Sequence, residues 1–189
     1  MIETTVRLLR GQGLRATGMN QIVAESGAPR GSIYFHFPGG KEQLAVEALR
    51  TAGETVALKI REALNAHRDV TRALRAYVES YAEEVRRSDF QRGCPVGNAA
   101  MDAAATTPAI REVCDEIFAG WTRLIAQRLE RDAFRKKDAE SVAEFILASI
   151  EGALILCRAR RSTEPLERVA QRLGAVLADA KRSPATRER

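Results

Sequence analysis

The stretch that most constrains this chain is Thr17–Lys41, TGMNQIVAESGAPRGSIYFHFPGGK, which predicts two short helices joined by a tight turn. The first helix is expected to begin after Thr17, because a threonine hydroxyl can cap the free amides of a first turn. Gly27 marks its end, since glycine tolerates the left-handed backbone that closes a helix. A second helix is predicted from Pro29, a favoured first-turn residue, to about residue 35, and a longer helix follows.

A helix pair of this kind can place its second helix in the major groove of DNA. The chain also resembles a known family here. Gly13, Thr17, Ile22 and Gly27, followed by GSIYFHF and then KEQL, resemble the DNA-binding domain of TetR-type transcriptional regulators. The resemblance covers about the first fifty residues and fixes more than ten positions. It implies a protein that binds palindromic double-stranded operator DNA as a homodimer.

Two kinds of DNA contact are expected from this segment, because some groups hold phosphates and others read bases. Helix N-termini bind phosphate through free amides, which favours Thr17 and Lys41 for the phosphate contacts. The resemblance adds Tyr34 and His36 to them. Arg30 can donate two hydrogen bonds to the O6 and N7 atoms of guanine. The residues expected to read bases are Pro29, Arg30, Gly31 and Ser32.

The rest of the chain repeats apolar residues at three- and four-residue spacing, the pattern of amphipathic helices, and no alternating strand pattern interrupts it. The sequence therefore predicts an all-α protein of about nine helices. One of them is expected to be capped by Asp69, a short one to begin at Asn98, and another to open at Pro108. A three-helix DNA-binding domain is expected over residues 1–45, with its helix-turn-helix at about 17–36. A larger effector-binding and dimerisation domain is expected over 46–182. Residues 183–189 are predicted to form a flexible tail.

Aromatic side chains recur in the predicted helices after residue 70, and TetR-type repressors that leave DNA on binding a ligand need an apolar cavity with a few polar anchors. Gly93–Ala104, GCPVGNAAMDAA, resembles the LmrA/YxaF-like branch, which includes lincomycin- and flavonoid-responsive repressors. That resemblance implies a small apolar or aromatic effector. Ordinary core packing is the alternative for the same side chains. The candidate effector residues are Tyr77, Tyr81, Phe90, Asn98, Met101, Phe118, Trp121, Phe145 and Ser149.

Small residues recur in the last two predicted helices and allow close helix approach. The family resemblance makes these helices the dimer interface, and a monomeric bundle is the alternative. The candidate interface residues are Ile150, Ala153, Leu156, Ala170, Leu173 and Leu177.

Charge alone does not identify a DNA-binding protein here. The net charge is +5, but residues 1–50 carry six Lys/Arg against four Asp/Glu. No apolar run approaches the roughly 18 residues of a membrane span, and no signal peptide is recognisable, so no membrane contact and a cytoplasmic location are expected.

No catalytic site, metal site or cofactor is expected. An all-α enzyme is disfavoured, because the only histidines, His36 and His67, fall in the second predicted helix of the pair and in a polar break. No HExxH motif, phosphate loop or carboxylate cluster accompanies them. A thiol-based redox sensor that uses Cys94 stays open as an alternative function, since this cysteine falls in a predicted loop.

Overall fold

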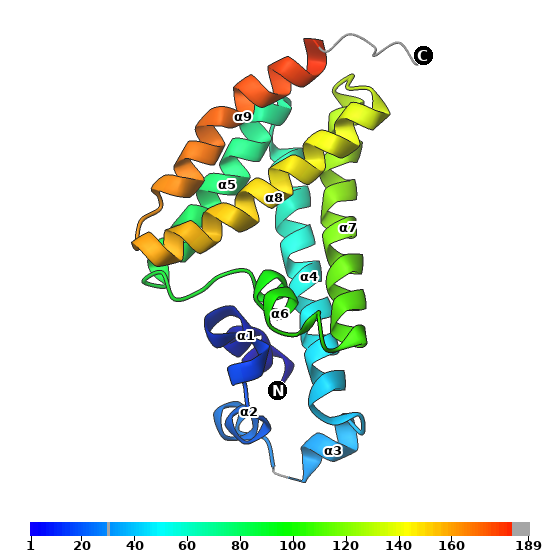
Figure 1. The fold of residues 1–189 in the computed structure, drawn as a ribbon, viewed down its shortest axis with the longest axis vertical. Helices are drawn as coiled ribbons and strands as arrows, with labels where there is room; N and C mark the ends of the chain where they lie inside the picture. Colours follow the sequence, from blue (N-terminus) through cyan, green and yellow to red (C-terminus); the bar gives the residue numbers. More distant parts are fainter. Residues whose placement is uncertain (30, 183–189) are drawn as a thin grey trace. The chain divides into compact units, whose positions relative to one another are not determined.

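The computed structural model describes residues 1–29 and 31–182, with backbone alone at 32 and 34, and this part of the chain is helical without strands. The predicted all-α class is confirmed. The predicted tail, 183–189, lies outside the described residues. The helices, drawn in Figure 1, are α1 (Ile2–Ala16), α2 (Met19–Ser26), α3 (Ser32–His36), α4 (Gly40–Ala66), α5 (Val70–Arg87), α6 (Pro95–Ala103), α7 (Pro108–Arg131), α8 (Lys136–Arg160) and α9 (Glu164–Arg182).

The chain divides into two compact units. Unit 1 combines Met1–Leu58 with Ser88–Gly120, and therefore contains α1, α2, α3 and α6. Unit 2 combines Lys59–Arg87 with the chain from Trp121 onward, and contains α5, α8 and α9. Two boundaries between the units fall inside the long helices α4 and α7, and the third follows Arg87 at the end of α5.

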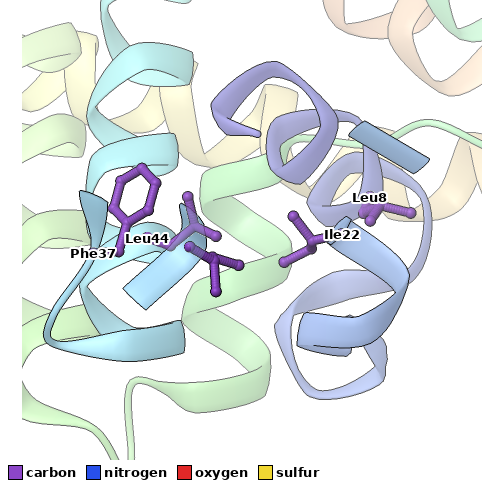
Figure 2. Packing of buried hydrophobic residues seen from close by; sticks show 5 residues of the cluster. Leu8, Ile22, Phe37 and Leu44 are labelled. Atoms are coloured by element: carbon purple, nitrogen blue, oxygen red, sulfur yellow. The ribbon is translucent and has the colours of Figure 1, made fainter. Parts of the chain in front are cut away.

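A small apolar core holds the N-terminal helices of unit 1 together (Figure 2). Each of α1, α2, α3 and α4 contributes at least one almost fully buried side chain, and Met19 and Val23 pack against the cluster from α2. Removal of such side chains from water is the main force that fixes short helices, which are unstable alone. The buried cluster consists of Leu8, Ile22, Ile33, Phe37 and Leu44.

In unit 2, α9 packs along both α5 and α8 (Figure 1). Arg128 of α7 fixes the C-terminal end of α4. Its guanidinium donates hydrogen bonds to the carbonyl oxygens of Leu64 and, at 3.1 Å, His67. The same group forms an ion pair with Asp132 at 3.2 Å. One side chain thereby satisfies carbonyl groups that a helix end leaves without partners.

Helix starts follow the sequence closely where a capping residue or a proline marks them. Asp69 was expected to cap a helix, and its Oδ1 accepts a hydrogen bond from the amide of Arg72 at 2.8 Å. Pro108 opens α7 as expected. The expected start of α6 at Asn98 is wrong: the helix begins at Pro95, with the Cys94 Sγ accepting from the amide of Gly97 at 3.3 Å.

Five of the six candidate interface residues are buried within the chain itself. They lie where α8 and α9 pack inside unit 2, so their surfaces are already covered and offer little to a partner subunit. Only Leu156 is exposed. The five buried residues are Ile150, Ala153, Ala170, Leu173 and Leu177.

No helix among the described segments is both long and apolar enough to cross a membrane.

Candidate nucleic-acid interface

Helices α2 and α3 form the predicted helix pair, with a shorter second helix than expected. Gly27 ends α2 in the left-handed region, with φ 66° and ψ 10°, as predicted. Helix α3 begins at Ser32, after Gly31, and not at Pro29. Glycine disfavours helix, which gives a physical reason for the late start. Arg30 lies outside the described residues.

The predicted cap of α2 is wrong. Gly18 occupies the cap position, and Thr17 is instead the C-cap of α1, directly after its last residue, Ala16. The Thr17 side chain is fully buried, and its hydroxyl donates a hydrogen bond to the carbonyl oxygen of Gly13 at 2.6 Å. A hydroxyl held in this way does not reach a phosphate, so Thr17 is a structural residue in this conformation.

The outward face of the α3 region carries most of the expected DNA contacts that the structure describes. Pro29, Gly31 and His36 are exposed, and Lys41 is half-buried in the first turn of α4. The side chains of Ser32 and Tyr34 lie outside the described part of the structure. The sequence prediction missed one residue on this surface: Phe35, whose side chain is 82% exposed.

A polar network on the surface of unit 1 ties α2 to α1. The Arg7 guanidinium donates to the Glu25 carboxylate at 2.5 Å, and the Gln21 amide donates to the same carboxylate at 2.8 Å. These two hydrogen bonds, Arg7 first, hold the pKa of Glu25 below its usual value. Gln12 extends the network by donating to Gln21 at 2.8 Å. Arg7 therefore serves the orientation of α2.

Helix α6 lies beside α1 (Figure 1), and the two helices are hydrogen-bonded at two places. The Asn98 side-chain amide donates to the carbonyl oxygens of Leu9, at 2.9 Å, and Arg10, at 3.1 Å. One turn later, Asp102 Oδ2 accepts from the amide of Leu14 at 2.8 Å. These bonds flank Gly13, where α1 is broken by a non-helical residue. Side chains of α6 thus pair backbone groups that the broken helix leaves free.

The candidate effector residues of unit 1 do not form one buried set. Asn98 is buried, but its amide serves α1 as described above. Met101 is exposed, and Phe90 and Phe118 are partly exposed. Asn98 and Met101 are therefore weak candidates, the first because its donor is occupied and the second because its side chain faces outward.

Within unit 2, three aromatic candidates are buried and one is not. Tyr77 and Tyr81 pack with ring centroids 6.2 Å apart, and Trp121 is almost fully buried. Ser149 is half-buried. Phe145 is 53% exposed on α8, so it does not line an enclosed cavity in this conformation.

A groove of about 300 Å³ between α5 and α9 in unit 2 was not predicted. Four of its five lining residues are charged or polar, and the Arg75 guanidinium at its edge donates to the carbonyl oxygen of Ala170 at 3.1 Å. The sequence does not predict this groove, because charged residues on two separate helices give no indication that the helices leave a space between them. The lining residues are Arg75, Glu79, Glu167, Ala170 and Gln171.

All three cysteines are free and buried. Burial raises the pKa of Cys114 to about 11 and also raises the pKa of Cys157. Cys94, expected in an exposed loop, caps the start of α6 with little of its surface exposed. Reactive thiols are accessible and have lowered pKa values. The burial of Cys94 thus gives no support to the redox-sensing alternative.

Known proteins resemble the chain over nearly its whole length. Residues 1–48 match the family described as bacterial regulatory proteins, tetR family, and residues 70–172 match the C-terminal domain of LmrA/YxaF-like transcriptional regulators. The transcriptional regulator YxaF of Bacillus subtilis is 34% identical over 173 residues, covering 92% of this chain and 91% of YxaF. The regulator LmrA of the same organism is 32% identical over 166 residues, covering 88% of each chain.

The fold also resembles solved structures over nearly the whole chain. A regulatory protein TetR from Rhodobacter sphaeroides superposes with a TM-score of 0.84 and covers 93% of this chain and 95% of its own, at 22% sequence identity.

Proposed function

Because this chain belongs to the TetR family of bacterial transcriptional regulators, we propose that it is a homodimeric repressor released from its operator by a small apolar or aromatic molecule. TetR-family regulators are DNA-binding transcription factors and not enzymes. The observation that carries the proposal is the α2–α3 pair, whose inner face is fixed by the apolar core while its outer face stays exposed.

The DNA-binding domain in this proposal comprises residues 1–45, and the effector-binding and dimerisation domain comprises 46–182. The two family matches, over 1–48 and 70–172, support this division. Base reading is assigned to Pro29, Arg30, Gly31 and Ser32, and phosphate contact to Tyr34, His36 and Lys41. Thr17 is left out, because its hydroxyl is buried and bonded to Gly13.

The dimer surface is assigned to the exposed apolar face of α8. Phe145, Ile155 and Leu156 are 53%, 52% and 44% exposed, respectively. Their spacing of ten and eleven residues, close to three helical turns, places them on one side of the helix. Exposed apolar surface of this kind marks an interaction site in a soluble protein. This face replaces the buried residues that the sequence favoured.

The effector site is assigned to Tyr77, Tyr81 and Trp121, the buried aromatic candidates of unit 2. Aromatic side chains with a polar end can pack against a planar ligand and fix its orientation. The LmrA/YxaF-like family match over 70–172 supports this assignment, since it covers all three residues.

The α1–α6 hydrogen bonds supply a route for release. A ligand weakens DNA binding only by its differential affinity for two conformations of the protein. Asn98 and Asp102 hold the backbone of α1, and α1 contributes Leu8 to the core beneath α2 and α3. A shift of α6 on effector binding would therefore move the helices that read DNA.

Selection of binding sites from random DNA tests this function. The full chain is expected to enrich an inverted repeat whose half-sites lie about one helical turn, 34–36 Å, or a multiple of it apart. Complexes on that repeat should contain an even number of chains. Failure to enrich any sequence, or enrichment of a site without two-fold symmetry, would overturn the proposal.

A further inference from the structure

Phe35 is the most exposed of the large apolar side chains in the described part of the chain. It lies in α3 between Ile33 and Phe37, both of which are buried in the core of unit 1. Residues two positions apart on a helix point in nearly opposite directions, because each residue advances about 100°. The two buried neighbours therefore fix α3 so that Phe35 faces away from the protein.

Gly31 lies one turn before Phe35, and residues four apart share a helical face. A Cβ built on Gly31 meets no atom of the described residues within 4 Å, so this position on the face of Phe35 leaves room for a close approach. The His36 ring stands edge-on to the Phe35 ring, with centroids 5.2 Å apart. The result is an apolar spot beside an open backbone position, on the helix that the family uses to read DNA.

We propose that Phe35 is a specificity-determining residue that packs against the C5-methyl group of a thymine in each operator half-site. The inference rests on the proposed function of the α2–α3 pair. In the major groove thymine alone presents an apolar group, whereas the other base edges present hydrogen-bond donors and acceptors. A phenyl ring can make no hydrogen bond with those edges, so a thymine methyl is the group it can recognise.

The experiment compares thymine with deoxyuridine, which differs only by that methyl group. Operator DNA obtained by selection is synthesised with each thymine replaced in turn, and the affinity of the full chain is measured for each duplex. Wild type should lose about fourfold in affinity at one position per half-site, the equivalent of burying one methyl group. Phe35→Ala should bind the thymine and deoxyuridine duplexes equally at that position.

Two further variants keep the result interpretable. Phe35→Leu retains an apolar side chain and should keep part of the methyl dependence, even where Phe35→Ala binds too weakly to measure. Leu58→Ala removes an exposed apolar side chain from α4 and should behave like wild type in every duplex.

Two results would overturn the inference. One is a wild-type protein indifferent to every thymine methyl. The other is a Phe35→Ala protein with the same methyl dependence as wild type. A Phe35→Ala variant that keeps this dependence but changes its oligomeric state would show that Phe35 contacts protein and not DNA. Failure to select any operator would instead contradict the proposed function, so the two failures are distinguishable.

Discussion

A Cβ atom on Gly13 would lie 2.1 Å from Oδ2 of Asp102, the same oxygen that accepts a hydrogen bond from the Leu14 amide at 2.8 Å. Gly13 also has φ 78°, a region in which side chains are strained. Glycine is therefore required at this position twice over, once for the backbone conformation and once for the approach of the carboxylate. The pair fixes how α6 meets α1.

Removal of that carboxylate should destabilise the protein. Asp102→Ala leaves the part-buried amide of Leu14 without its acceptor, and an unpaired buried donor costs about 1–3 kcal/mol. Urea denaturation should show this loss, whereas Asp115→Ala, on the exposed side of α7, should change the free energy of unfolding by less than about 0.5 kcal/mol. Equal stabilities for the two variants would mean that the Asp102 hydrogen bonds do not support α1.

The Gly13–Asp102 contact should also be visible as an energetic coupling. Gly13→Ala introduces both backbone strain and a clash with Asp102, but in an Asp102→Ala background only the strain remains. The substitution should therefore destabilise the double variant less than it destabilises wild type, with a coupling of at least about 0.5 kcal/mol. Strictly additive effects would place the two residues out of contact.

The exposed face of α8 should control the oligomeric state. Ile155→Arg introduces a charge into the proposed interface, where an uncompensated buried charge costs about 3–5 kcal/mol. Sedimentation should show monomers with unchanged helical content, because Ile155 is not part of the core of its own chain. Leu58→Arg, an equally exposed position on α4, should remain dimeric. A dimer that survives Ile155→Arg would move the interface elsewhere.

The sequence predicted the helices best where one residue decides the local structure. Gly27, Asp69 and Pro108 each mark a helix end or start by backbone geometry or capping, and the structure agrees at all three. The prediction that Thr17 caps α2 was wrong because it considered only the residues that follow Thr17. In the structure the Thr17 hydroxyl donates a hydrogen bond back to Gly13, in the kinked α1. Local pattern does not reveal such a kink.

Long-range packing explains the other differences. The α8 and α9 residues expected at the interface follow the apolar spacing that core residues also follow. This spacing does not distinguish a helix face that packs within its own chain from one that packs against a partner subunit. Asn98 looked like a polar anchor for a ligand, but its amide bonds to carbonyls 88 and 89 residues away. The exposure of Phe35 was missed for a different reason. Phe35 lies between two other aromatic residues in the sequence, and the sequence alone does not show which of the three side chains faces outward.

The three thiols should be unreactive in the native protein. At pH 8 a Cys114 thiol with a pKa of about 11 is almost entirely protonated, and the raised pKa of Cys157 acts in the same direction. An aromatic disulfide reagent should therefore titrate three thiols per chain only after denaturation. Peroxide should leave operator affinity unchanged. Rapid reaction of Cys94 in the native state, with loss of DNA binding, would revive the redox alternative.

Effector binding should be reported by Trp121, the single tryptophan of the chain. Its indole is buried, so the emission of the free protein should be blue-shifted. Planar aromatic molecules that release DNA should quench this emission with the same half-saturation, and should weaken operator affinity by about 5- to 150-fold, the usual range of allosteric coupling. Trp121→Phe should alter the ligand affinity while leaving operator affinity nearly intact. Release of DNA without any tryptophan signal would place the effector site elsewhere.

DNA reading by the α2–α3 segment can be measured through the affinities of Arg30→Ala and Lys41→Ala for operator and random DNA over a range of salt concentrations. Arg30→Ala should weaken operator binding by about 1–3 kcal/mol per half-site and relax the preference at one base pair, with a much smaller effect on random DNA. Lys41→Ala should weaken binding to both DNAs similarly. It should also reduce the slope of log affinity against log salt concentration by about one unit for each lysine removed. Unchanged affinity of Arg30→Ala for both DNAs would mean that the α2–α3 segment does not read the bases of the operator.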